Sequence, residues 1–255
     1  MIELRNVHKR FGRHVVLDGV DFVVREGETV ALLGPSGTGK SVLLKHIIGL
    51  LKPDSGDVVV DGLSVPALGR LELAALRRRI GYAFQTGALF DSVSVFENIR
   101  LGIADEVCSR DPAFCRDRVA ECLRLVNLPE DAGRLMPIQL SGGMRKRVGI
   151  ARAIAGSPKY LLYDEPTSGL DPVNADVMDG LIESLQHELH ATSVVVSHDV
   201  RGSFRVADRI ALLHQGRIRA VGTPEEFMAA KDEVVRGFLE RDFQAADVEI
   251  GRAHV

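Results

Sequence analysis

The residues best suited to chemistry form the continuous run Gly34-Pro35-Ser36-Gly37-Thr38-Gly39-Lys40-Ser41. Apolar residues at 29–33 precede it and others follow at 42–48, which predicts a strand, a phosphate-binding loop and a helix. Glycines let the loop curl so that its backbone N–H groups point inward, beside the positive end of the helix. Lys40 supplies a cation for terminal phosphates, and Ser41 supplies a hydroxyl for magnesium. The run therefore predicts a site for a nucleoside polyphosphate with Mg²⁺.

Strands and helices alternate after this loop in the order that builds a parallel sheet. A helix is predicted over about 174–189, and the apolar, β-rich runs that predict strands are 80–84, 159–163 and 192–196. Parallel strands place their carboxyl ends at one edge of the sheet, where ligands bind. Gln85, Asp164 and His198 each lie at the end of one of these strands. We therefore expect these three side chains beside the phosphate loop in an α/β fold.

An antiparallel lead-in sheet is predicted before the loop, from β-rich runs at 2–7 and 15–24. Phe11 lies in the polar turn between them, where an aromatic side chain has little reason to be exposed. Two interpretations stay open. The ring stacks on a purine base, a contact worth roughly 1 to 3 kcal/mol, or it anchors the loop by partial burial.

The segment from about 86 to 157 is predicted to be a helical insertion within the α/β body, because it has no clear strand pattern. Ser94 and Glu97 have the spacing of a capping box at the start of one helix. Pro112 marks the first turn of another helix.

Three cysteines in this insertion, Cys108, Cys115 and Cys122, repeat every seven residues. The spacing fits neither a CxxC redox pair nor a zinc site. After the helix start at Pro112, Cys115 and Cys122 fall on one apolar helical face. We therefore expect buried thiols that pack in the core.

Composition limits the classes of function. The 255 residues are 45% hydrophobic, which is ample for a packed core, and the net charge of -3 argues against a general nucleic-acid-binding surface. No run of 18 apolar residues occurs, and the start at Met1 to Arg5 lacks the apolar core of a signal peptide. We expect a protein that stays in the cytosol unless a partner holds it at a membrane.

The C-terminal part has a predicted helix start at Pro224 and then an apolar stripe on a charged helix. The stripe consists of Val234, Val235, Phe238, Leu239 and Phe243. Packing against the body of the protein is the favoured interpretation, and binding to a partner stays open.

Six motifs in a fixed order carry a resemblance to a known family. The phosphate loop is followed by Gln85, Leu140-Ser141-Gly142-Gly143-Met144, Asp164-Glu165, Ser168-Gly169-Leu170-Asp171 and His198. Over essentially its whole length the chain resembles the ATP-binding subunit of an ABC transporter. The resemblance implies an α/β fold, a P-loop NTPase core with a mainly parallel sheet, an antiparallel lead-in and an inserted helical subdomain. It places an ATPase domain at 1–231, the helical subdomain at about 86–157 and a C-terminal helical tail at 232–255.

The resemblance also implies catalytic roles at the strand ends. Glu165 would be the general base that orients the attacking water, and His198 would hydrogen-bond the γ-phosphate. Gln85 would reach Mg²⁺ and water, while Asp164 would hold Mg²⁺ together with Ser41. The implied reaction is ATP hydrolysis, with ATP and Mg²⁺ as cofactors.

Two copies of the chain are implied to share each nucleotide. Ser141, Gly142 and Gly143, at the start of a helix near Met144, would contact the γ-phosphate held by the loop of the other copy. Asp171 would join the two sites in a head-to-tail dimer. The residues implied to bind ATP within one chain are Phe11, Val16, Gly34, Pro35, Ser36, Gly37, Thr38, Gly39, Lys40 and Ser41.

Two positions depart from the usual family pattern: Met144 replaces a signature Gln, and Phe11 replaces a frequent Tyr. Neither change removes a catalytic group. The run Gly-Gly-Met-Arg-Lys-Arg and residues 85–98 resemble the ATPases of Mla/Mce-type phospholipid transport systems. This resemblance implies lipid cargo, an integral-membrane permease as partner and an Mce-domain lipid-binding protein beyond it. It places the chain on the inner face of the cytoplasmic membrane, held there by the permease.

Two alternative functions share these motifs. The ATPase of an importer for a small polar solute, such as an amino acid, has every catalytic motif. A soluble mechanical ATPase that acts on DNA or ribosomes uses the same nucleotide sandwich. Such proteins resemble tandem cassettes or carry long coiled-coil insertions, whereas this sequence has one phosphate loop and a short insertion, so no nucleic-acid partner is expected.

Overall fold

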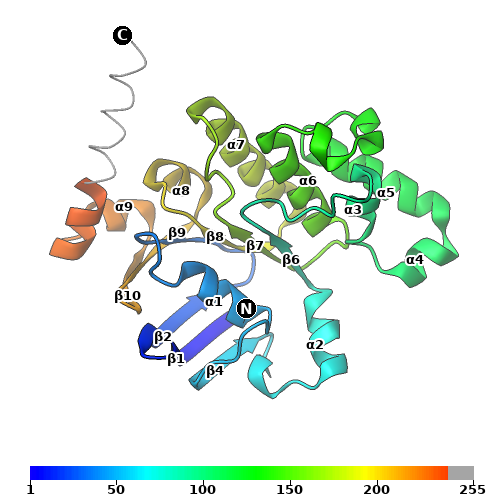
Figure 1. Cartoon of the computed structure of the whole chain (residues 1–255). Helices are drawn as coiled ribbons and strands as arrows, with labels where there is room; N and C mark the ends of the chain where they lie inside the picture. The colour runs from blue at the N-terminus through cyan, green and yellow to red at the C-terminus, as the bar shows by residue number, and fades with distance from the viewer. Residues whose placement is uncertain (241–255) are drawn as a thin grey trace, which may run out of the picture.

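The strands form two sheets in the structure, a computed structural model that describes residues 1–240 (Figure 1). The larger sheet has the strand order β10-β9-β3-β8-β7-β6. Its strands are β3 (Thr29–Leu33), β6 (Ile80–Ala83), β7 (Tyr160–Asp164), β8 (Thr192–Val196), β9 (Arg209–His214) and β10 (Arg217–Gly222). The smaller sheet has the order β2-β1-β4-β5. Its strands are β1 (Ile2–Phe11), β2 (His14–Val24), β4 (Ser55–Val60) and β5 (Leu63–Ser64).

The larger sheet is parallel from β9 to β6, and only its edge strand β10 pairs in the antiparallel sense. Every residue of β3, β6, β7 and β8 is buried. Continuous apolar strands of this kind are typical of a parallel sheet that is covered on both faces. The carboxyl ends of these strands meet at one edge, as predicted, and the phosphate loop follows β3 there.

The smaller sheet is the predicted antiparallel lead-in, with β1 paired to both β2 and β4. Apolar side chains of both sheets share one core cluster with helix α1 (Lys40–Ile47). Helix α1 contributes Leu43, Leu44 and Ile47, all fully buried. This packing fixes the start of α1, and therefore the phosphate loop, against both sheets. The short η1 turn (Val65–Ala67) and helix α2 (Arg70–Arg77) connect β5 to β6.

The segment 86–157 contains helices and turns and no strand, as predicted. Its helices are α3 (Val95–Arg100), α4 (Asp105–Arg110), α5 (Pro112–Leu125) and α6 (Gly142–Ile154), with η2 (Glu130–Arg134) and η3 (Pro137–Gln139) between α5 and α6. Ser94 caps α3 by accepting from the backbone N–H of Glu97 at 3.2 Å. The Glu97 carboxylate pairs with Arg100, so only the Ser94 half of the predicted capping box forms. Helix α5 begins at Pro112, as predicted, and Asp111 caps it.

The cysteines are buried as predicted, but two of them are not thiols. Cys108 on α4 and Cys115 on α5 form a disulfide, and Cys122 is free and buried. The prediction of three core thiols is therefore wrong for this pair. The turn between α4 and α5 brings the two Cα atoms to 5.2 Å, within the usual range for a disulfide. Burial raises the pKa of Cys122 to about 11, which keeps that thiol protonated and unreactive.

The C-terminal stripe packs against the body of the protein. Val235 is fully buried and Leu239 nearly so, in a cluster with Ala31 and Leu33 of β3. Val234 and Phe238 pack against the same cluster, while Phe243 lies outside the described residues. Further helices are α7 (Pro172–Leu189), α8 (Val200–Val206) and α9 (Pro224–Met228). Packing on the body is thus the correct interpretation for the stripe up to Leu239.

We expect Val235→Ala to lower the free energy of unfolding by about 2 kcal/mol, because it removes two buried methyl groups and leaves a cavity. Chemical denaturation followed by circular dichroism measures this change. Val221→Ala is the matched control, since Val221 is 41% exposed and its truncation should change stability by less than about 0.5 kcal/mol. Equal effects at the two positions would contradict the packing of this stripe.

Candidate functional site

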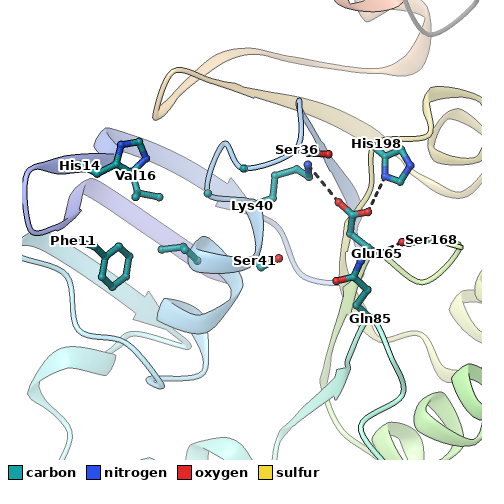
Figure 2. Close-up of a pocket in the computed structure, with 13 residues that line it drawn as sticks. Phe11, His14, Val16, Ser36, Lys40, Ser41, Gln85, Glu165, Ser168 and His198 are labelled. Atoms are coloured by element: carbon teal, nitrogen blue, oxygen red, sulfur yellow. Dashed lines mark hydrogen bonds and ion pairs between the residues drawn. The ribbon is translucent and has the colours of Figure 1, made fainter. Parts of the chain in front are cut away.

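A cleft of about 530 Å³ lies where the phosphate loop meets the ends of β6, β7 and β8 (Figure 2). Three groups of residues line it. The lead-in sheet contributes Phe11, His14 and Val16, and the loop with the start of α1 contributes Ser36, Gly37, Gly39, Lys40, Ser41 and Val42. The strand ends contribute Gln85, Glu165, Ser168 and His198. The structure therefore brings together the phosphate loop and the polar residues that were expected at one edge of the sheet.

The phosphate loop needs glycine where it turns into α1. Gly39 has a φ of 101°, and a Cβ on it would lie 2.6 Å from Cγ1 of Val16. A larger residue would therefore push the lead-in sheet away from the loop. Lys40 is 4% exposed and donates to the backbone carbonyls of Gly34 at 2.7 Å and Pro35 at 3.2 Å. Burial lowers the pKa of Lys40, and the nearby Glu165 opposes that shift.

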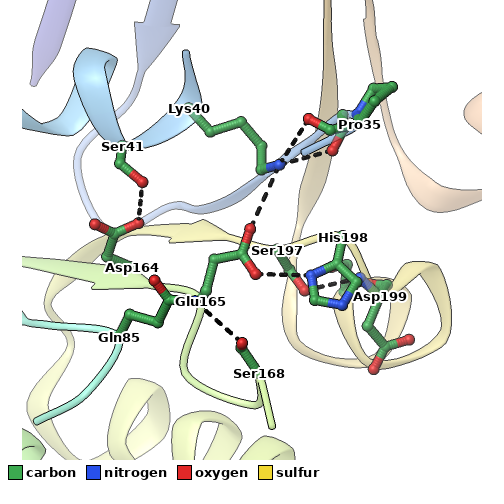
Figure 3. Close-up of polar contacts among 12 residues, drawn as sticks. Pro35, Lys40, Ser41, Gln85, Asp164, Glu165, Ser168, Ser197, His198 and Asp199 are labelled. Carbon is green, nitrogen blue, oxygen red and sulfur yellow. Dashed lines mark hydrogen bonds and ion pairs between the residues drawn. The ribbon is translucent and has the colours of Figure 1, made fainter. Parts of the chain in front are cut away.

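Asp164 ends β7 and accepts hydrogen bonds on both carboxylate oxygens, and Figure 3 shows the one from Ser41. Ser41 Oγ donates to Oδ1 at 2.6 Å, and the Tyr82 hydroxyl donates to Oδ2 at 2.8 Å. Burial and the adjacent carboxylate raise the pKa of Tyr82, so its hydroxyl keeps its proton and acts as the donor. The hydroxyl and the carboxylate are hard oxygen ligands of the kind that Mg²⁺ prefers, and they lie side by side at the loop.

Glu165 lies between two cationic or potentially cationic side chains (Figures 2 and 3). His198 Nδ1 donates to its Oε2 at 2.7 Å, and Lys40 Nζ is 3.5 Å from its Oε1. The hydrogen bond from His198 lowers the pKa of Glu165, and the same bond raises the pKa of His198. Glu165 is therefore held as a carboxylate at neutral pH, the form that a base requires.

The backbone of Glu165 is in the left-handed region, with a φ of 51°, which is uncommon for a residue with a side chain. Lys146 Nζ, from helix α6, donates to the Glu165 carbonyl at 3.2 Å and supports this conformation. Lys146 was not among the predicted site residues. Lys146 lies among other charged residues of α6, so the sequence did not indicate that its side chain reaches the end of β7.

Gln85 reaches across the cleft, and its Nε2 donates to Oγ of Ser168 at 3.1 Å (Figure 3). Ser168 and His14 line the cleft but were not predicted as site residues. Ser168 could have been found, because it follows β7 by four residues at the same edge of the sheet.

Phe11 lies at the far end of the cleft, with 48% of the residue exposed. About half of the residue is buried, so partial burial as a loop anchor stays open. Stacking on a purine base stays a prediction. Lys9 Nζ is 5.6 Å from the centroid of the ring, and Lys9 itself pairs with Asp54.

Some predicted site residues do not line the cleft of their own chain: Gly34, Pro35, Thr38, Ser141, Gly142, Gly143, Asp164 and Asp171. Ser141 caps α6 by accepting from the N–H of Met144 at 3.2 Å, as predicted. Asp171 caps α7 by accepting from the N–H of Asn174 at 3.0 Å. The structure therefore leaves the signature residues and Asp171 outside the cleft formed by a single chain.

The sequence model of the family described as ABC transporter matches residues 17–168, more than half of the chain. The chain belongs to the ABC transporter family. The match begins in the lead-in sheet and includes the phosphate loop, the signature residues and Asp164-Glu165. This confirms the predicted family and agrees with an ATP-binding site in the cleft.

Curated ABC relatives of the chain differ in what they transport. A sulfate/thiosulfate import ATP-binding protein, CysA of Bradyrhizobium diazoefficiens, is 42% identical over 93% of this chain and 68% of its own length. A methionine import ATP-binding protein, MetN of Caulobacter vibrioides, is 42% identical over 99% of this chain and 77% of its own length. The intermembrane phospholipid transport protein MlaF of Haemophilus influenzae is 38% identical over 94% of this chain and 90% of its own length. Against CysA of Burkholderia mallei, the chain spans 63% of the relative's length.

Solved ABC cassettes share the fold of this chain. The cassette MJ0796, in a dimeric post-hydrolysis state bound to ADP and Pi, is 34% identical and covers 88% of this chain with a TM-score of 0.77. The match spans 99% of that cassette chain. CbiO1 of Clostridium perfringens, part of an ABC transporter complex, is 29% identical over 97% of this chain and 98% of its own, with a TM-score of 0.79. The fold class and the predicted activity, ATP hydrolysis coupled to transport, are confirmed.

Among residues 1–240, no helix combines the length and the apolar character that crossing a membrane requires.

Proposed function

We propose that this ABC ATPase powers phospholipid transport of the Mla/Mce type through a membrane permease. The observation that carries the proposal is the match to MlaF, which extends over 90% of that protein. The unusual Met144 in the signature and the residues 85–98 support the same subfamily. The chain would lie on the inner face of the cytoplasmic membrane, with an Mce-domain protein further along the transport path.

We propose roles in ATP hydrolysis for polar residues in and beside the cleft. Glu165, held as a carboxylate beside His198, orients the water that attacks the γ-phosphate. His198 and Lys40 contact the phosphate oxygens on which negative charge develops. Ser41, Gln85 and Asp164 would hold Mg²⁺, which would supply positive charge to offset the negative charge of the phosphates.

Each nucleotide site is proposed to need a second copy of the chain. The residues Ser141 to Gly143 and Asp171 lie outside the cleft of their own chain, and the related cassette MJ0796 is dimeric. In a head-to-tail dimer, the start of α6 from one copy would face the phosphate loop of the other.

The permease is proposed to dock on residues 84–98. Phe90 in this segment is 58% exposed and Phe84 is 37% exposed. Asn98 is fully buried and holds the loop, because it accepts from the N–H of Phe90 and donates to the carbonyls of Phe90, Val93 and Ser94. The loop therefore presents apolar side chains from a fixed backbone.

Reconstitution tests the cargo. We expect the ATPase activity of the chain, reassembled with its permease in vesicles, to rise when a phospholipid-loaded Mce-domain protein is added. The second candidate, import of a small polar solute, is favoured by the MetN match, and stimulation by a solute receptor with methionine would establish it instead. Co-purification with ribosomes or DNA in place of a permease would overturn both.

A further inference from the structure

Both oxygens of the Asp164 carboxylate are occupied by hydroxyl donors, and only one of those donors belongs to the phosphate loop. Ser41 donates to Oδ1 at 2.6 Å, and Tyr82 donates to Oδ2 at 2.8 Å. We propose that Tyr82 is a positioning residue that fixes the Asp164 carboxylate for magnesium. The inference rests on the proposed role of Asp164 as a magnesium-holding residue.

The register of the parallel sheet places Tyr82 within reach of Asp164. Tyr82 on β6 pairs with Leu162 on β7, and Asp164 lies two residues further along on the same face as Leu162. The hydroxyl of Tyr82 therefore reaches Asp164, which ends the neighbouring strand. Tyr82 is 9% exposed and packs in the core cluster with α1, and the ring of Phe84 lies against it at 4.3 Å between centroids, tilted by 42°.

A carboxylate with one donor on each oxygen has a defined orientation. Asp164 is 7% exposed, so without Tyr82 its Oδ2 would lose its protein donor in a nearly buried position. The carboxylate would then rotate or recruit water, and its alignment with Ser41 would loosen. Because Mg²⁺ demands nearly ideal octahedral geometry, this loosening should weaken the metal more than the nucleotide.

Tyr82 also lies three residues before Gln85 on the same segment. Strand β6 and the turn after it therefore connect Tyr82, which bonds to Asp164, with Gln85, one of the residues proposed to hold Mg²⁺. No catalytic contact by Tyr82 is implied, since its hydroxyl meets Asp164 and its ring lies in the core.

A matched control exists on the same face of the sheet. Tyr160 on β7 belongs to the same core cluster, and its hydroxyl donates to a different aspartate, Asp61. Tyr160 begins β7, whereas Asp164 ends it. Tyr160→Phe thus removes a tyrosine–aspartate hydrogen bond at the edge of the sheet opposite to the nucleotide cleft.

The test measures binding of a fluorescent ATP analogue to the full chain, with excess EDTA and across a Mg²⁺ titration. For Tyr82→Phe we expect an unchanged affinity for the ATP analogue in EDTA. Magnesium raises this affinity, and we expect the midpoint of that rise to shift to an about tenfold higher Mg²⁺ concentration. Tyr160→Phe should shift neither value. Thermal melting of both variants confirms that binding is measured on folded protein.

An unchanged magnesium midpoint in Tyr82→Phe would overturn the inference. A loss of affinity for the ATP analogue that is as large in EDTA as in Mg²⁺ would also overturn it, because it would indicate general damage to the cleft. Asp164→Asn distinguishes failure of the inference about Tyr82 from failure of the magnesium role proposed for Asp164. If Asp164→Asn shifts the midpoint and Tyr82→Phe does not, the inference about Tyr82 is wrong. If neither shifts it, the magnesium role proposed for Asp164 is wrong as well.

Discussion

Glu165→Gln is expected to reduce ATP turnover by about 10³-fold and to leave ATP binding within about threefold of the unsubstituted chain. The amide has nearly the same shape as the carboxylate but cannot accept a proton from the attacking water. His198 and Lys40, which flank Glu165 at 2.7 and 3.5 Å, remain available to the phosphates. Phosphate release measures turnover, and titration with a fluorescent ATP analogue measures binding.

Glu188→Gln is the matched control for this substitution. Glu188 is an exposed residue of α7, so its replacement should alter neither turnover nor binding. Unchanged hydrolysis in Glu165→Gln would remove Glu165 from the role of general base. Loss of binding together with turnover would indicate that its pairing with Lys40 and His198 organises the cleft instead.

Lys40→Ala is expected to weaken ATP binding by about 100-fold, which corresponds to about 2.7 kcal/mol. A lysine 4 Å from a phosphate charge contributes up to about 4 kcal/mol at an effective dielectric constant near 20, and the release of its contacts with the loop carbonyls offsets part of that loss. Equilibrium titration with the same analogue measures the change.

Lys45→Ala provides the comparison, because Lys45 lies on the same helix and does not line the cleft. It should leave the affinity for ATP unchanged. Tight ATP binding by Lys40→Ala would show that the loop is not the main phosphate site.

The site was predictable to the extent that parallel topology controls it. Gln85, Asp164 and His198 each end an apolar strand, and a parallel sheet brings such ends together whatever the details of packing. The phosphate loop was equally predictable, since glycines followed by Lys40 in this order are typical of phosphate-binding loops. Strand pattern alone therefore placed the loop and the polar strand ends at one edge.

Other features depend on register and tertiary contact, which residue patterns do not encode. Tyr82 belongs to an apolar strand and has the pattern of a core residue; its bond to Asp164 follows from the pairing of β6 with β7. The disulfide between Cys108 and Cys115 depends on the angle of the turn between two helices. Lys146 reaches Glu165 only because α6 packs beside β6 and the end of β7 lies next to it.

Mixing two inactive variants tests the central claim, that each ATP is hydrolysed between two copies of the chain, most directly. Lys40→Ala removes the phosphate lysine and keeps the signature, while Ser141→Arg blocks the signature and keeps the loop. A mixed dimer then contains one intact site, built from the loop of one copy and the signature of the other. We predict that the mixture hydrolyses ATP well above the sum of the two variants measured alone. Activity no greater than that sum would contradict the shared site.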